Sequence, residues 1–141
     1  MKILAIDHGE KRTGLAICDP AERMAVALPT HAMTGNDAVE LAELAKEQAV
    51  ELIVVGLPVN MDGTEGPRAK AVRSFAAELE ASAEVAVEMW DERLSTAEGD
   101  ARLRMHGLDR KERAKRKDTA AAIVILETYM ENRRKSGDRR P

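Results

Sequence analysis

Three observations predict that this chain folds as one α/β domain. Apolar, strand-like runs alternate along the chain with amphipathic, helix-like stretches, and only short polar connections separate them. At 141 residues, the chain has the size of a single domain and can bury about two thirds of the surface of its unfolded state. We therefore expect residues 1–141 to form one unit around its own apolar core.

The first three strands are expected to form an antiparallel meander. "KILAID" (2–7) is a nearly continuous apolar run, which suits a strand buried on both faces. A polar turn leads into "GLAICD" (14–19), and "MAVALPTHAM" (24–33) follows closely. Pro29 predicts that this third strand lies at a sheet edge or at a bulge, because proline cannot donate a ladder hydrogen bond.

The middle of the chain alternates between helix and strand. An amphipathic helix begins near Asn36, and Asn36 or Asp37 is expected to cap it. "VELIVVG" (50–56) reads as a buried strand, and the preceding helix implies a crossover to a parallel neighbour. After a loop rich in turn formers, Pro67 suits the first turn of a second helix over about 67–81. Its apolar stripe consists of Val72, Phe75, Ala76 and Leu79.

The last third of the chain carries a strand and two helices. "EVAVEMWDE" (84–92) alternates as a strand does and ends on two acids. A short helix over about 95–105 and a mobile basic loop at about 107–117 are expected next. The run at 117–134 predicts a strong final helix, and residues 135–141 predict a frayed tail.

The charge is unevenly distributed along the chain. Residues 1–100 carry nine Lys and Arg against 19 Asp and Glu, a net charge of −10, whereas residues 101–141 carry 13 against six, a net charge of +7. Eight of the bases lie in "RLRMHGLDRKERAKRK" (102–117). Such a run is either a solvated face or an electrostatic footprint for a polyanion, because each phosphate contact releases counterions.

Composition argues against several classes of protein. Cys18 is the only cysteine, so no internal disulfide is possible, and no Cys and His spacing indicates a zinc site. No apolar run approaches the roughly 18–20 residues of a membrane span, and we expect a cytoplasmic protein without a targeting segment. With one Phe, one Trp and one Tyr, the chain lacks the stacking platforms of a single-strand binder.

Three carboxylates stand where the predicted topology brings them to one edge of the sheet. Asp7 ends the first strand, Glu92 ends the last strand, and Asp118 opens the last helix. Carboxylates brought this close repel one another unless hard cations such as Mg²⁺ or Mn²⁺ lie among them. Two such ions can activate a water molecule and cleave a phosphodiester bond without a histidine or serine nucleophile.

Each of these acids also has a simpler interpretation. Asp7 can accept hydrogen bonds from turn amides, Asp118 can cap a helix, and Glu92 can form an ion pair with Arg93. The three histidines show no regular ligand spacing, and His8 should point away from Asp7, since adjacent residues of a strand face opposite sides. We expect none of the histidines to be catalytic.

Four stretches resemble, in order and spacing, the motifs of the bacterial YqgF family, which is related to the RuvC resolvases. They are "IDHGEKRTGLA" (6–16), "VVGLPVNMDGTEGPRA" (54–69), "DERLSTAE" (91–98) and "KDTAAAIVILETYM" (117–130). The resemblance extends from Lys2 to about Arg134. The departure from the pattern is Ser95, which stands where many members have Thr and keeps the hydroxyl.

The resemblance implies an RNase H-like fold, a mixed five-stranded sheet whose first three strands are antiparallel, flanked by helices. It also implies a nuclease that uses one or two Mg²⁺ or Mn²⁺ ions in maturation of the 16S rRNA 5′ end. Asp7, Glu92 and Asp118 match the family's acids and are the candidate catalytic and metal-binding residues. The candidate substrate-binding residues are Lys11, Arg12, Thr64, Arg93, Arg113, Lys115 and Arg116.

Other interpretations stay open on the sequence alone. Similarity to RuvC fits a Holliday-junction resolvase that acts on branched DNA, and a nucleic-acid-binding factor without catalysis would keep the basic segment. An actin-like ATPase begins with a similar D-x-G turn, but it needs two domains and this chain supplies one. Thr64 can equally well serve the turn in which it lies. Nothing in the sequence separates RNA from DNA as substrate, or a monomer from a homodimer.

Overall fold

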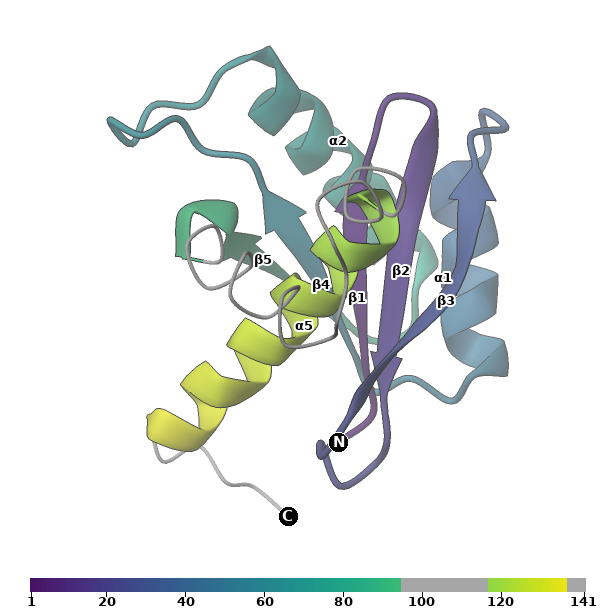
Figure 1. Cartoon of the computed structure of the whole chain (residues 1–141). Helices are drawn as coiled ribbons and strands as arrows, with labels where there is room; N and C mark the ends of the chain where they lie inside the picture. Colours follow the sequence, from purple (N-terminus) through teal and green to yellow (C-terminus); the bar gives the residue numbers. More distant parts are fainter. Residues whose placement is uncertain (95–116, 137–141) are drawn as a thin grey trace.

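A five-stranded mixed sheet forms the centre of the protein (Figure 1). The structure is a computed structural model that describes residues 1–94 and 117–136, with the backbone alone for 117–119. Across the sheet the strand order is β3-β2-β1-β4-β5. The strands are β1 Ile3–His8, β2 Arg12–Cys18, β3 Ala25–Ala32, β4 Leu52–Leu57 and β5 Ala86–Asp91.

The strand pairing confirms the predicted fold class. β1 pairs antiparallel with β2, and β2 pairs antiparallel with β3. β4 runs parallel to both β1 and β5, so the crossover implied by the helix before it is present. The carboxyl ends of β1, β4 and β5 therefore lie at one edge of the sheet, which is where ligands bind in open α/β sheets.

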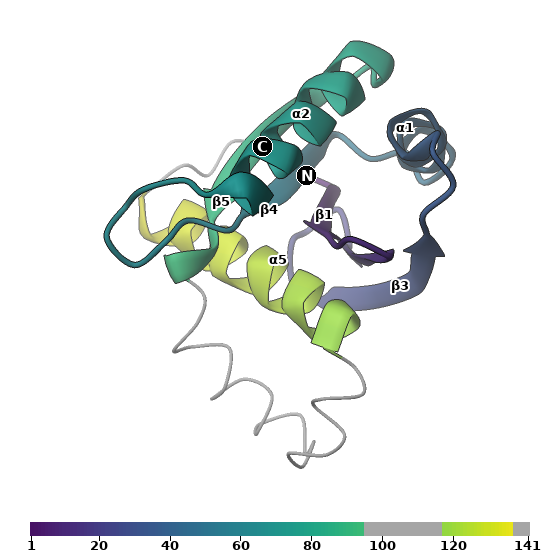
Figure 2. The ribbon, with the colours of Figure 1, turned by 90° about the horizontal axis from the view of Figure 1, so that it is seen from above.

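Three helices of the described residues cover the two faces of the sheet (Figure 2). They are α1 Asp37–Glu47, α2 Pro67–Ser82 and α5 Lys117–Lys135, and a short 3₁₀ helix spans Glu92–Leu94. α1 and α2 pack on one face, and α5 crosses the other. The layers follow from the period of two in a strand: Leu4 and Ile6 join the core under α1 and α2, while Ile3 and Ala5 join the core under α5.

The predicted helices and strands agree with the structure apart from their ends. β2 begins at Arg12, two residues before the predicted start, because its pairing with β1 continues into the turn as far as His8 and Thr13. β4 begins at Leu52 rather than residue 50, because the turn that follows α1 extends to Val50. In this turn Ala49 has a positive φ of 57°, and the amide of Val50 donates to the carbonyl of Ala45. Pro29 lies in the edge strand β3, as predicted, and the β2–β3 register shifts between Thr13 and Leu15.

The start of α1 differs from the predicted cap. Asn36 occupies the cap position but its side chain makes no capping hydrogen bond. Asp37 instead accepts hydrogen bonds from the backbone amides of Thr34 and Gly35, at 3.0 and 3.3 Å, and from His31 at 2.9 Å. The carboxylate thus ties the end of β3 to the first turn of α1.

Two predicted segments lie outside the described residues. They are the short helix at about 95–105 and most of the basic loop at about 107–117. Residues 137–141 of the predicted tail also lie outside the described residues. α5 begins at Lys117 and continues one residue beyond the predicted end, to Lys135. No helix in the described part of the chain is long and apolar enough to span a membrane.

Candidate active site

Asp7 lies at the carboxyl end of β1, on the face of the sheet that α5 covers. Its partner across the antiparallel β1–β2 ladder is Gly14, whose side of the sheet is the same because paired residues face alike. Since Gly14 carries no side chain, no side chain from this position covers the half-buried Asp7. The rigid centre of the sheet therefore presents a carboxylate at its functional edge.

Glu92 follows directly on β5 and turns back over the end of β4. Gly56 makes room for it: a Cβ atom on Gly56 would lie 2.9 Å from Glu92 Oε1 and 2.5 Å from Ile125 Cδ1. Both distances are far shorter than van der Waals contact. The glycine at this point of β4 thus leaves room for the site, because a Cβ atom here would shift the Glu92 carboxyl group or the side chain of Ile125 on α5.

Asp7 and Glu92 form a pair of carboxyl groups at the strand ends. Burial, followed by the negative charge of Asp7 and a hydrogen bond with it, raises the pKa of Glu92 to about 7. Arg68 opposes the rise through its positive charge. Near neutral pH the pair therefore holds a proton for part of the time, and a cation can take the place of that proton.

Two half-buried carboxyl groups in this arrangement fit a divalent metal. Both offer the hard oxygen donors that Mg²⁺ and Mn²⁺ prefer, and a bound cation would favour the ionised form of Glu92 that burial and Asp7 disfavour. The third predicted acid, Asp118, is the second residue of α5. Figure 1 shows that the first turn of α5 lies at the sheet edge where β1 and β4 end. The structure describes the backbone of Asp118 and not its side chain.

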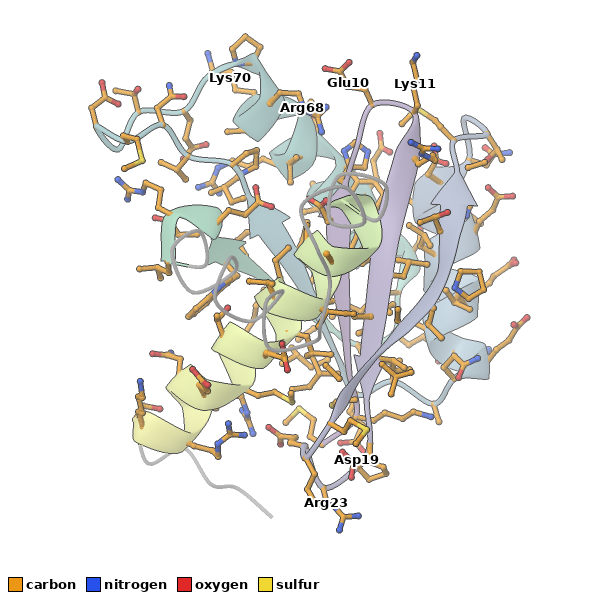
Figure 3. All side chains as sticks on the ribbon, viewed as in Figure 1. Glu10, Lys11, Asp19, Arg23, Arg68 and Lys70 are labelled. Atoms are coloured by element: carbon orange, nitrogen blue, oxygen red, sulfur yellow. The ribbon has the colours of Figure 1, made fainter. Side chains whose placement is uncertain are left out.

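The predicted substrate-binding residues fall into two groups. Lys11 and Arg12 are exposed in and after the turn between β1 and β2, and Figure 3 shows Lys11 at the tip of that turn. Thr64 serves its own turn, because its hydroxyl donates to Asp62 at 2.6 Å and accepts from Asn60 at 3.0 Å. Arg93 also lies in the described part of the chain, whereas Arg113, Lys115 and Arg116 lie outside it.

Arg93 pairs with Asp91 and not with Glu92. Its guanidinium donates to both carboxylate oxygens of Asp91, with the shortest bond at 2.7 Å. It also reaches the backbone carbonyls of Asn60 and Met61, at 3.5 and 3.4 Å. The Glu92–Arg93 ion pair that we considered from the sequence is therefore wrong, and Arg93 connects the end of β5 to the loop after β4.

Arg68 is a site residue that we did not single out from the sequence. It is the second residue of α2, and its guanidinium donates to the carbonyl of His8 at 2.5 Å. His8 is the last residue of β1, next to Asp7, so Arg68 reaches the edge that carries the acids. The sequence held a signal, since "GPRA" places an arginine just after the proline that begins α2, within the second motif.

His8 points away from Asp7, as the strand period predicts. Its ring stacks on Phe75 of α2, with the ring centroids 4.3 Å apart. Burial, and then the charge of Arg68, lower the pKa of His8, so the ring is neutral at pH 7. His8 thus packs α2 onto the sheet and lies on the opposite face from the acids.

A second group of potential metal ligands lies apart from this site. His31, Asp37 and Glu40 have ligand atoms within 4.8 Å of one another. His31 pairs with Thr13 in the β2–β3 ladder, and Thr13 pairs with His8, so this group lies on the α1 and α2 face of the sheet. The hydrogen bonds of Asp37 with His31, Thr34 and Gly35 already explain why these side chains lie together, because they join the end of β3 to the start of α1.

The mixed sheet, with its strand order and the helices on its two faces, defines the class of fold as RNase H-like. The chain belongs to the RuvX family, the YqgF family of the motif resemblance, because the family model described as "RuvX: Holliday junction resolvase" matches residues 1–132. Membership makes the chain part of a nuclease family, whose reaction is the hydrolysis of phosphodiester bonds.

Curated relatives match along nearly the whole chain. A protein of Anaeromyxobacter dehalogenans (strain 2CP-1) is 44% identical over 135 residues, which cover 94% of this chain and 98% of the relative. A protein of Pelotomaculum thermopropionicum is 38% identical over 148 residues, covering 100% and 96%. Both carry the name "Putative pre-16S rRNA nuclease".

Solved structures confirm the fold. Thermus thermophilus RuvC in complex with a Holliday junction substrate has a TM-score of 0.64 at 16% identity, covering 95% of this chain and 96% of that one. The fowlpox virus Holliday junction resolvase has a TM-score of 0.57 at 15% identity, covering 94% and 99%. The predicted RNase H-like architecture is therefore correct, and the actin-like ATPase gives way to the nuclease family.

Proposed function

We propose that this chain is a divalent-metal-dependent nuclease that cleaves precursor 16S rRNA near its 5′ end. The observation that carries the proposal is the Asp7–Glu92 pair, two half-buried carboxyl groups held together at the edge of the sheet where ligands bind. Relatives named for pre-16S rRNA and matched over almost their whole length support the choice of substrate. Asp118 completes the proposed set of metal ligands from α5, and a cytoplasmic location follows from such a substrate.

The proposed roles follow from the element that holds each acid. Asp7 lies on the central strand and provides the most rigid ligand, while Glu92 and Asp118 approach from β5 and α5. When bound, Mg²⁺ or Mn²⁺ would neutralise phosphate oxygens and lower the pKa of the attacking water. Lys11 and Arg12, with the basic residues Arg113, Lys115 and Arg116, would bind backbone phosphates on either side of the acids.

The test compares the wild-type protein with Asp7→Asn and Glu92→Gln on an RNA that carries the 16S 5′ leader, with Mg²⁺ or Mn²⁺. We expect both variants to lose at least about a hundredfold in cleavage rate, because each removes a ligand charge. Glu43→Gln, on the exposed surface of α1, is the matched control and should cleave like the wild type. Full activity in Asp7→Asn, with a native circular dichroism spectrum, would rule out the proposed site.

A Holliday-junction resolvase is the second candidate function. The description of the matching family model favours it, and the test is a four-way DNA junction in the same assay. Faster cleavage of the junction than of the leader RNA would replace the proposed substrate while keeping the site. Binding of either substrate without metal-dependent cleavage would instead indicate a nucleic-acid-binding factor.

A further inference from the structure

Arg68 differs from the other paired arginines of the described residues in what it contacts. Four of them form ion pairs with carboxylates: Arg23 with Asp19, Arg73 with Glu65, Arg93 with Asp91 and Arg133 with Glu22. Arg68 makes one hydrogen bond among the described residues, and its acceptor is the backbone carbonyl of His8. A half-buried guanidinium therefore keeps most of its five N–H donors for another acceptor.

The position of Arg68 is set by two elements. Pro67 begins α2 and places Arg68 in its first turn, and the bond to His8 anchors the guanidinium at the end of β1. Figure 3 shows Arg68 at the same end of the molecule as Lys11 and Lys70, with Asp19 and Arg23 at the opposite end. The side chain thus lies beside the carboxyl ends of the strands.

Two acids alone would repel a phosphodiester. Arg68 supplies positive charge next to them, because its guanidinium donates to the backbone carbonyl of His8, the residue that follows Asp7. Guanidinium groups are suited to this task, because their planar fork of donors matches two oxygens of one phosphate.

We propose that Arg68 binds a phosphate of the substrate strand at the carboxyl ends of β1 and β4, beside Asp7 and Glu92. This inference rests on the proposed nuclease function and adds a substrate-binding residue to it. The phosphate would then form an ion pair with Arg68, which the structure shows with no carboxylate hydrogen bond among the described residues. The strand would then run over the edge of the sheet between α2 and the start of α5.

The experiment measures RNA binding separately from cleavage. In an Asp7→Asn background, which removes cleavage, we compare Arg68 with Arg68→Gln and Arg68→Lys on the 16S leader RNA at several salt concentrations. We expect Arg68→Gln to weaken binding on the order of tenfold to a hundredfold, as for a lost charge-assisted contact. The slope of log affinity against log salt should fall by about 0.7, the value for one phosphate contact on a single strand.

The variant Arg68→Lys keeps the charge and loses the planar fork, so it should recover the salt slope but only part of the affinity. Arg73→Gln is the matched control, because Arg73 lies on the same helix and its partner Glu65 is on the surface. The control should bind RNA as the parent does. Thermal unfolding of each variant checks that a loss of binding is not a loss of fold.

The alternative is that Arg68 only balances the charge of the two acids. Arg68→Gln would then change the affinity for Mn²⁺, measured by calorimetry in the otherwise wild-type protein, and leave RNA binding unchanged. That result would overturn the inference. The binding comparison is independent of catalysis: if the wild type fails to cleave any substrate, the proposed function fails, and the Arg68 comparison still decides whether this residue binds the strand.

Discussion

Glu92 is held in a position that favours function over stability. Its carboxyl group is mostly buried against Asp7, and the pKa of about 7 means that ionising it in the folded protein is unfavourable below neutral pH. A divalent cation would remove the penalty by supplying the missing positive charge. Without the metal, ionisation of Glu92 lowers the free energy of unfolding.

The first prediction is that Glu92→Gln stabilises the metal-free protein at alkaline pH. The folded pKa of Glu92 is raised from 4.5 to about 7, so the wild type loses unfolding free energy as the pH rises through this window. At pH 8 the neutral amide should be more stable on the order of 2 kcal/mol, while at pH 4.5 the two proteins should be similar. Urea unfolding with a chelator measures this. Equal stability of the wild type and Glu92→Gln at pH 8 would show that ionised Glu92 does not destabilise the fold.

The second prediction is that Gly56→Ala on β4 displaces the Glu92 side chain, which follows the neighbouring strand β5. The new Cβ would meet Ile125 Cδ1 at 2.5 Å and Glu92 Oε1 at 2.9 Å, so one of these groups must move. We expect a loss of about 1–3 kcal/mol in stability and on the order of tenfold in cleavage rate. Gly66→Ala is the control, because its Cβ would meet only Asn60 Nδ2 at 3.7 Å. Unchanged activity in Gly56→Ala would mean that Glu92 need not lie where the structure has it.

At the scale of elements, the connection between β4 and α2 packs Val59 against the core and is otherwise shaped by hydrogen bonds. Asn60, Asp62 and Thr64 bond to one another, and Gly63 has a positive φ of 91°. Arg93 joins this loop to β5 through the carbonyls of Asn60 and Met61. The position of Pro67, and with it that of α2, therefore depends on contacts from the strand that also delivers Glu92.

The third prediction concerns Arg93. Arg93→Ala should raise amide hydrogen exchange in residues 58–66, because it removes the bonds from the guanidinium to the loop carbonyls. If Arg93 also binds substrate, as predicted from the sequence, RNA binding should weaken and its salt slope should fall as well. Asp91→Asn separates the roles, since it loosens the same ion pair and keeps the cation. Unchanged exchange in Arg93→Ala would refute its role in holding the loop.

The sequence predicted the elements well because their signals are local. Apolar periodicity located β1, β4 and α5 to within a few residues, and Pro29 correctly indicated an edge strand. Contacts between distant residues were harder to predict. The bond from Arg68 to His8 spans 60 residues of sequence, and no periodicity reports it. Likewise, Arg93 pairs with Asp91 and not with Glu92, because the side chain of Glu92 lies against Gly56 of β4. This close approach exists only in the folded sheet.

At the scale of the whole molecule, the acids and the bases occupy different parts of the chain. The net charge of −3 hides an excess of bases after residue 100, of which Arg113, Lys115 and Arg116 lie outside the described residues. The segment that contains them joins the 3₁₀ helix at Glu92–Leu94 to the start of α5 at Lys117. It therefore leaves and returns at elements that carry two of the candidate acids, Glu92 and Asp118.

The fourth prediction is that replacing Arg113, Lys115 and Arg116 together with Gln weakens RNA binding and flattens its salt dependence. If each side chain contacts one phosphate, the slope of log affinity against log salt should fall by about 2. A lower affinity with an unchanged slope would count against an electrostatic footprint. Replacing Arg23, Lys46 and Arg73, which are exposed in the described part of the chain, provides a control with the same change in net charge.

A buried ion pair fastens the far end of α5 to the turn between β2 and β3. Arg133 Nε donates to Glu22 Oε1 at 3.0 Å, and Arg133 Nη2 donates to Glu22 Oε2 at 3.2 Å. The terminal ammonium of Met1 also donates to Glu22, at 2.9 Å. The side chains of Arg133 and Glu22 are only 9% and 17% exposed, so losing one partner would leave the other charge poorly solvated.

The fifth prediction is an acid-dependent loss of stability that traces to Glu22. Burial raises the pKa of Glu22, but the hydrogen bonds from Arg133 and the Met1 ammonium outweigh it and hold the pKa below its usual value of 4.5. The ionised form is therefore favoured by folding, so its contribution is complete above about pH 4.5 and is lost as the pH falls through the lowered pKa. Glu22→Gln should cost on the order of 2 kcal/mol at pH 7.

Urea unfolding at pH 7 and pH 3.5 measures both parts of this prediction. The stability gap between the wild type and Glu22→Gln should shrink at pH 3.5, since below about pH 4.5 the Glu22 carboxyl group takes up a proton more readily in the unfolded chain than in the folded one, which favours unfolding of the wild type. Glu43→Gln, on the exposed surface of α1, should show little gap at either pH. A gap of the same size at both pH values would mean that the shape of the residue, and not its charge, fastens α5 to the sheet.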